Sequence, residues 1–163
     1  MRIIWVTTRV FGTDMSQSTQ IGAAQALCNR GHDVTFVCPT SPNRNKESEI
    51  EFIEVKSNPF LFSFTLGFER AISSELGKII SSVSPDVIIS EWQTYDSVSK
   101  VVRNTQIPNI IMDRSPPIKS TLRGKLQGFH YSRAWKSASK ADGAVIKSKH
   151  LHNYLSSRFR LPD

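Results

Sequence analysis

The chain has 163 residues, of which 39% are hydrophobic, and its formal net charge is +7. This length and composition fit one globular domain with its own core, and they exclude an intrinsically disordered chain. The apolar runs are too short for a membrane-spanning helix and the first ten residues do not resemble a signal peptide, so we expect a cytoplasmic protein.

Short apolar runs typical of buried strands alternate with segments of helical periodicity along the chain. In chain order the pattern predicts strand 2–7, helix 17–30, strands 33–38 and 50–56, helix 64–83, strand 85–90, helix 94–104, strand 107–113, helix 118–140, strand 142–148 and helix 149–159. We expect Ser16 or Ser18 to cap the first helix and Gly31 to end it in a left-handed conformation. We expect Gly124 and Gly128 to interrupt the fourth helix.

Alternating strands and helices predict a parallel sheet that helices cover on both faces. Right-handed crossovers favour a Rossmann-like, doubly wound α/β sheet in three α/β/α layers, built by a single domain over residues 1–163. Ligands of such sheets bind at the carboxyl ends of the strands, near the point where the strand order reverses. We therefore expect functional residues within 8–16, 91–95 and 113–118.

The positive charge is concentrated in one segment. Residues 114–141 contain no Asp or Glu, whereas the rest of the chain carries 14 basic and 14 acidic residues. The basic residues of this segment are Arg114, Lys119, Arg123, Lys125, Arg133, Lys136 and Lys140. A localised basic segment indicates an anionic partner at one place on the surface.

Four segments resemble, in order, motifs of GT-B glycosyltransferases of the glycosyltransferase family 4 type. They are RGHDVTFVCP at 30–39, SPDVIISEW at 84–92, IPNIIMDRSPP at 107–117 and ADGAVIKSKHLHNYL at 141–155. The resemblance covers essentially the whole chain. It implies one half of a GT-B fold, namely the acceptor-side N-terminal domain, with the donor-binding C-terminal domain outside this chain.

The resemblance also implies a function. We expect the acceptor-binding domain of a hexosyltransferase-like enzyme that moves a sugar from a nucleotide-sugar donor to a lipid-linked or glycan acceptor at the cytoplasmic membrane face. We expect no cofactor in this domain, because the donor binds with the second domain. That domain either continues a longer chain or is a separate partner chain, and this half alone is expected to be inactive. The sequence leaves open the sugar, the acceptor and retaining or inverting chemistry.

The loop after the first strand departs from the family pattern. Family members carry a glycine pair there, whereas this loop has a single glycine and an acidic residue that would repel a phosphate. The loop is either a capped turn without a ligand or a cleft wall whose oxygens contact the acceptor. As acceptor- or phosphate-binding residues of the loop we expect Gly12, Thr13, Asp14 and Ser16.

Two further strand ends carry charged residues. Glu91 follows the fourth strand, and it is either a catalytic base, a group that orients an acceptor hydroxyl, or a solvated or ion-paired carboxylate. Asp113 and Arg114 end the fifth strand; they either form an ion pair with each other, or Arg114 and Ser115 bind a phosphate. Under the functional hypothesis Glu91 and Asp113 are the catalytic candidates.

Two segments suggest contact with an anionic membrane. The first, 58–68, is rich in Phe, and the second, 118–140, mixes cations with aromatic and aliphatic residues. Core packing and an ordinary basic surface helix are the respective alternatives. The candidate membrane residues are Phe60, Phe62, Phe64, Lys119, Arg123, Lys125, Arg133 and Lys136.

Other function classes have less support in the sequence. The charge would also suit a nucleic-acid- or nucleotide-binding Rossmann module, but no helix-turn-helix, RNP-like or dinucleotide glycine motif is present. The two cysteines and four histidines have no metal-ligand spacing, so we expect reduced thiols and no metal site.

Overall fold

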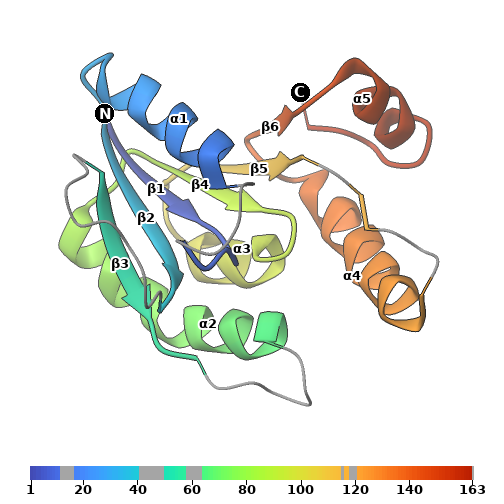
Figure 1. Cartoon of the computed structure of the whole chain (residues 1–163), viewed down its shortest axis with the longest axis horizontal. Coiled ribbons are helices and arrows are strands. Elements are labelled where there is room, and N and C mark those ends of the chain that lie inside the picture. Colours follow the sequence, from blue (N-terminus) through green and yellow to red (C-terminus); the bar gives the residue numbers. More distant parts are fainter. Residues whose placement is uncertain (12–16, 41–49, 58–63, 115, 118–120, 163) are drawn as a thin grey trace.

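Figure 1 shows a computed structural model of the chain, which describes residues 1–11, 17–40, 50–57, 64–114, 116–117 and 121–162. The strands of this part are β1 (Arg2–Val6), β2 (Asp33–Pro39), β3 (Glu51–Val55), β4 (Val87–Glu91), β5 (Asn109–Asp113) and β6 (Gly143–Ile146). The helices are α1 (Gln17–Cys28), α2 (Phe64–Val83), α3 (Tyr95–Val102), α4 (Leu122–Ala138) and α5 (Lys149–Ser156). Every element that the sequence predicts is present, with ends that differ by a few residues.

The strands form one parallel sheet in the order β3-β2-β1-β4-β5-β6. The chain first runs outward from β1 to β3, returns through α2 to β4 on the other side of β1, and then runs outward to β6. This is the doubly wound order of a Rossmann sheet, and it confirms the predicted fold class. The order reverses between β1 and β4, so the carboxyl ends of these two strands mark the position where such sheets bind ligands.

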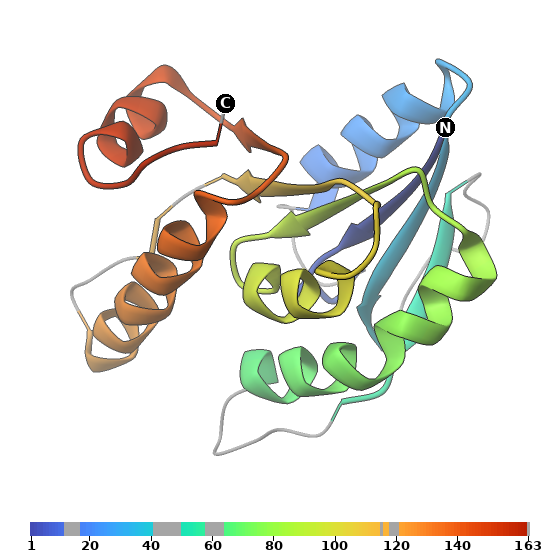
Figure 2. The same ribbon diagram turned by 180° about the vertical axis from the view of Figure 1, so that it is seen from behind.

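Alternate residues of β1 face two separate cores. Ile3 and Trp5 pack with Val34 and Phe36 under α1, whereas Ile4 and Val6 pack with residues of α2 and α3 on the opposite face. Figures 1 and 2 show α1 on one face of the sheet and α2 and α3 on the other, which gives the predicted three layers. A parallel sheet covered in this way needs apolar residues on both faces of its strands, and β1 and β2 have them.

A third core cluster joins α4 and α5 to the sheet beside β5. Its buried residues include Tyr131 and Trp135 of α4, Leu151 and Leu155 of α5, and Ile111 of β5. The cluster fixes one face of α4 against the domain, while the amino-terminal end of the helix extends away from the sheet (Figure 2). Within the described residues, no helix combines the length and the apolar composition that crossing a membrane requires.

The expected interruption of the fourth helix is wrong. Helix α4 runs without a break through Gly124 and Gly128, both of which are buried. Tertiary packing of the face that carries Tyr131 and Trp135 outweighs the low helix propensity of glycine. The side-chain oxygen of Thr121 also caps the helix by accepting a hydrogen bond from the Gly124 N–H at 3.0 Å.

The predicted end of the first helix is confirmed, since Gly31 has φ +81°. Helix α1 begins at Gln17, so Ser18 lies inside its first turn and is not the cap. The other predicted cap, Ser16, lies outside the described residues.

Candidate functional site

The carboxyl ends of β1, β4 and β5 bring polar side chains from distant parts of the sequence together. The register pairs Trp5 with Ile89, and side chains alternate along each strand, so Thr7 and Glu91 point to the face that α1 covers. Gln20, near the start of α1, lies on the same face of the sheet. Arg114 directly follows β5, the strand next to β4. Two of the three segments that the sequence predicts for the functional edge therefore contribute side chains to one cluster.

Glu91 is the centre of this cluster. Its side chain accepts hydrogen bonds from Thr7 Oγ1 at 2.7 Å, Gln20 Nε2 at 2.9 Å and Arg114 Nη2 at 2.8 Å. Glu91 is 3% exposed, so the solvated alternative is wrong and the ion-paired alternative is the one observed. A buried carboxylate with three donors is rigid, and it holds the Arg114 guanidinium in one orientation.

Asp113 belongs to a second hydrogen-bond group on the opposite face of the sheet. Met112 pairs with Glu91 in the register, so the next residue of β5 points the other way, towards α4. There the Asp113 carboxylate accepts hydrogen bonds from the Tyr131 hydroxyl and from Trp135 Nε1, the latter at 2.9 Å. Burial, together with the hydrogen bond and charge of Asp113, raises the pKa of Tyr131 well above its ordinary value, so its hydroxyl stays a donor.

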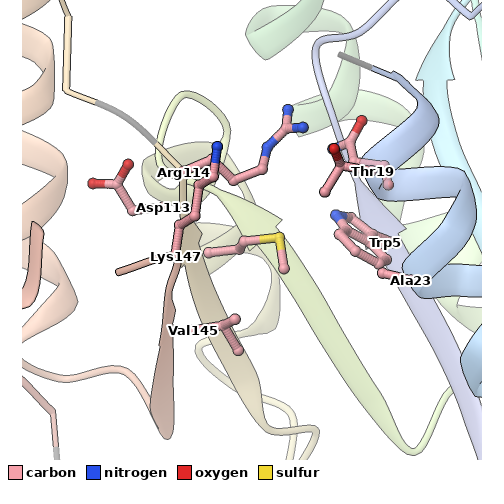
Figure 3. A pocket seen from close by; sticks show the side chains of 9 residues that line it. Trp5, Thr19, Ala23, Asp113, Arg114, Val145 and Lys147 are labelled. Carbon is pink, nitrogen blue, oxygen red and sulfur yellow. The ribbon is translucent and has the colours of Figure 1, made fainter. Parts of the chain in front are cut away.

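A cavity of about 120 Å³ adjoins the Glu91 cluster on the α1 face. Its walls come from β1, α1, β5 and β6, and they are formed by Trp5, Thr19, Gln20, Ala23, Met112, Asp113, Arg114, Val145 and Lys147. In Figure 3 the side chain of Arg114 extends towards Thr19 of α1, and the Asp113 carboxyl group points away from Trp5.

Two buried polar atoms of the cavity residues have no hydrogen-bond partner within the described part of the chain. They are the Nε1–H donor of Trp5 and the Oε1 acceptor of Gln20, and both residues are 1% exposed. A buried donor or acceptor without a partner costs about 1–3 kcal/mol. A ligand hydroxyl can both accept from a donor and donate to an acceptor, so the cavity has the polarity for a small hydroxylated or phosphorylated group.

The structure brings together part of the site that the sequence predicts. Glu91 and Arg114 interact directly, while Asp113 is separated from Glu91 by the sheet. Five candidates lie outside the described residues, namely Gly12, Thr13, Asp14, Ser16 and Ser115. Their predicted contacts with an acceptor or phosphate stay predictions.

Sequence reasoning missed several residues of the site. Thr7 and Lys147 lie at the carboxyl ends of predicted strands, so their position was a usable signal. Gln20, Trp5 and Tyr131 resembled ordinary helix or core residues, and nothing local distinguished them.

The predicted membrane residues are only partly described. Phe60, Phe62 and Lys119 lie outside the described residues, as do the side chains of Phe64 and Arg123. Lys125 and Lys136 are exposed on α4, and Arg133 forms a 3.1 Å ion pair with Asp96.

Helix α4 also exposes an apolar stripe that the sequence pattern did not single out. Leu122, Leu126 and Phe129 follow at helical spacing and are 77%, 61% and 68% exposed. They lie on the outer face of the helix, opposite the face that carries Tyr131 and Trp135. Three large exposed apolar side chains on one stripe indicate a contact surface.

The described residues contain no group of three or more His, Cys, Asp or Glu side chains that could hold a metal ion.

The model of one protein family matches most of the sequence. The family is Glycosyltransferase Family 4, and the match covers residues 21–163. None of the curated proteins matches the sequence significantly.

Solved structures of GT-B glycosyltransferases share the fold. Sucrose-phosphate synthase from Thermosynechococcus elongatus superposes with a TM-score of 0.72 at 13% identity, over 100% of this chain and 46% of its own. LpCGTa in complex with UDP superposes with a TM-score of 0.66 at 18% identity, over 99% of this chain and 51% of its own. A UGT transferase from Siraitia grosvenorii in complex with UDP superposes with a TM-score of 0.63 at 12% identity, over 99% of this chain and 49% of its own. The chain spans about half the length of these structures, and the likeness shows one half of a GT-B fold.

Proposed function

This chain belongs to Glycosyltransferase Family 4, and we propose that it is the acceptor-binding half of a glycosyltransferase. The proposed reaction moves a hexose from a nucleotide-sugar donor to a lipid-linked or glycan acceptor. The observation that carries the proposal is the cavity at the carboxyl edge of the sheet, where Arg114 is held by Glu91 and two buried polar atoms have no partner among the described residues. The family and the fold do not favour the alternative of a nucleic-acid-binding module.

In the proposed site, Arg114 is the group that touches the substrate. A guanidinium presents its N–H donors in a planar fork, which suits the oxygens of a phosphate on the acceptor or the donor, and Glu91 fixes the direction of that fork. Lys147, on the neighbouring strand end, adds a second positive charge. The Trp5 N–H and Gln20 Oε1 are the donor and acceptor for an adjacent hydroxyl group.

Glu91 and Asp113 have proposed roles as positioning residues. Glu91 already accepts three hydrogen bonds, so a role as catalytic base would require it to release at least one donor. Asp113 fixes the end of β5 to α4 through Tyr131 and Trp135. Both carboxylates thereby fix the strand end from which Arg114 extends.

The donor is proposed to bind a second domain, either in the same polypeptide or in a separate chain. This chain spans about half of its structural neighbours, which supports a role as one half of an enzyme. UDP is bound in the LpCGTa structure, and this supports a nucleotide sugar as the donor here.

We further propose that α4 brings this half to the cytoplasmic face of a membrane. The exposed stripe of Leu122, Leu126 and Phe129 would enter the interface, and Lys125 lies beside it to meet anionic headgroups. A lipid-linked acceptor would then lie in the same plane as the domain.

A transfer assay tests the central proposal. The chain is assayed with nucleotide sugars and a lipid-linked acceptor, alone and together with the donor-binding half. We expect transfer only from the combination, and a loss of about 100-fold in kcat/KM for Arg114→Ala. The control Arg160→Ala, which removes an exposed cation outside the cavity, should leave kcat/KM unchanged. Turnover by the chain alone at the rate of the combination would contradict the half-enzyme.

A second assay addresses the opening loop. Asp14→Gly in the two-domain enzyme restores the small residue of the family pattern. If the loop lines the cleft, the acceptor KM or the transfer rate changes; if neither changes, the loop is a structural turn.

A further inference from the structure

A groove of about 720 Å³ lies between α3 and α4, on the edge of the sheet opposite the cavity. Its walls include the last turn of α3, the connection to β5, and the carboxyl-terminal half of α4. Asn109, the first residue of β5, and Asp142, just before β6, also line it, which places the groove at the amino ends of these strands. The groove and the cavity share no lining residue.

The groove is strongly positive. Five cations line it, two from α3 and its end and three from α4 and its end, namely Lys100, Arg103, Arg133, Lys136 and Lys140. The carboxylates among the lining residues are Asp96 and Asp142. Asp96 is paired with Arg133, and Asp142 Oδ2 accepts the Asn109 N–H at 2.8 Å.

Four of these cations have no ion-pair partner within the described part of the chain. They are Lys100, Arg103, Lys136 and Lys140, all of them exposed. Two pairs of like charges on facing helices repel each other, and an anion between them removes that repulsion.

A buried polar group at the groove also lacks a partner. Asn109 is 3% exposed, and its Oδ1 accepts a 2.6 Å hydrogen bond from the Ser90 hydroxyl. Its Nδ2 donor has no acceptor among the described residues. The groups of the groove that lack a partner, the Asn109 amide and the four cations, are therefore all hydrogen-bond donors. They suit a ligand that is rich in oxygen acceptors.

We infer that the groove between α3 and α4 is a second anion site, which binds a phosphate-bearing group through Lys100, Arg103, Lys136 and Lys140. The groove volume of about 720 Å³ lies within the range of about 300–1,000 Å³ that ligand pockets have. The phosphate belongs either to a lipid headgroup or to a soluble polyphosphate, and the site is independent of the proposed transfer reaction.

Calorimetric titration of the chain with inorganic pyrophosphate tests the inference. We expect saturable binding that weakens about tenfold in the double variant Lys100→Ala/Arg103→Ala. The matched control Arg30→Ala/Lys149→Ala removes two exposed cations outside the groove and should bind as the unmodified chain does. The variant Arg114→Ala/Lys147→Ala removes the cations of the cavity instead, and it should keep the component of the binding that the groove variant loses.

Sedimentation with vesicles distinguishes the two sources. Vesicles of phosphatidylcholine, with or without phosphatidylglycerol, are mixed with the same variants. If the groove variant loses binding to the anionic vesicles, the phosphate is that of a headgroup. If it loses pyrophosphate alone, the ligand is soluble. Either result supports the anion site.

Three results would overturn it. Equal weakening of pyrophosphate binding in the groove variant and the control variant would show that binding depends on overall charge and not on the groove. Loss of binding in the Arg114→Ala/Lys147→Ala variant alone would move the phosphate to the cavity. Absence of binding to both pyrophosphate and anionic vesicles would remove the site. None of these results contradicts the proposed transfer reaction, so the two proposals fail separately.

Discussion

Arg114 donates a 2.8 Å hydrogen bond to Glu91 across the ends of β5 and β4, and their side chains are 16% and 5% exposed. This ion pair connects two strand ends at the edge where a doubly wound sheet binds its ligands. Thr7 and Gln20 donate to the same carboxylate, so the pair joins β1, α1, β4 and β5. The cluster is therefore both a structural link and the support of the proposed substrate-binding cation.

Replacing the carboxylate should destabilise the domain. In Glu91→Gln one carboxylate oxygen that accepts hydrogen bonds is replaced by an NH₂ group, which would face other donors. Arg114 also loses its counter-charge. We expect the free energy of unfolding to fall by about 2–4 kcal/mol in urea denaturation. Glu75→Gln is the matched control, because its 3.3 Å pair with Lys78 is exposed, and it should cost less than about 0.5 kcal/mol. Equal losses would show that the Glu91 cluster does not hold the strand ends.

The second hydrogen-bond group can be tested through its donor. Tyr131→Phe removes the hydroxyl that donates to buried Asp113 and leaves the ring in place. We expect a loss of about 1–3 kcal/mol in the free energy of unfolding, because the buried carboxyl group then has one hydrogen-bond donor fewer. Tyr154→Phe is the control, since that tyrosine makes a ring contact with Arg158, and its removal of a hydroxyl should be nearly neutral. A neutral Tyr131→Phe would leave the Asp113 group without a stabilising role.

Glu69 should make stability depend on pH. Burial raises its pKa from 4.5 to about 7, and Asp96 contributes to the increase, while Lys100 and Arg133 act in the opposite direction. The folded state therefore holds a proton that the unfolded state has released between these two values. The contribution of Glu69 to the free energy of unfolding is therefore highest at acidic pH, and it decreases as the pH rises towards 7.

Urea denaturation at about pH 5 and about pH 8 measures this dependence. Glu69→Gln, which keeps the neutral shape at both values, should flatten the part of the profile that falls as the pH rises. If the variant and the unmodified chain have parallel profiles, Glu69 does not titrate in this range.

The exposed apolar stripe on α4 should contribute to membrane binding and not to folding stability. In Leu126→Ser/Phe129→Ser both residues are exposed, so the free energy of unfolding should change by less than about 0.5 kcal/mol for each site. Binding to phosphatidylglycerol-containing vesicles should weaken roughly tenfold, because apolar area no longer enters the interface. Ala26→Ser, an exposed apolar position of α1, is the control for vesicle sedimentation. Unchanged sedimentation of the α4 variant would remove the proposed membrane contact.

Two glycines should respond in opposite directions to the same substitution. Gly31 has φ +81°, where a Cβ atom is strained, so Gly31→Ala should cost about 1 kcal/mol. Gly77 lies inside α2, where an added Cβ atom would meet no atom within 4 Å apart from the adjoining backbone of the helix, so Gly77→Ala should add about 0.5–1 kcal/mol. Thermal unfolding of both variants measures the difference, and a common sign would contradict this assignment of backbone conformations.

Local sequence patterns specify the strands and helices and their order along the chain. Apolar alternation and helical periodicity are local signals, so they identified every strand and helix of the described residues, and Gly31 identified the end of α1. Crossover handedness then restricts the topology to a doubly wound sheet, and this topology puts Glu91 and Arg114 at the carboxyl ends of the strands.

Which side chains meet depends on how distant elements pack together. The donors to Glu91 lie 84, 71 and 23 residues away in the sequence, and no local pattern specifies such partners. Strand register put Asp113 on the opposite face from Glu91, and the packing of Tyr131 and Trp135 decided which face of α4 stays exposed. Periodicity states that a residue faces a core or solvent, whereas pairing depends on how separate elements are placed in space.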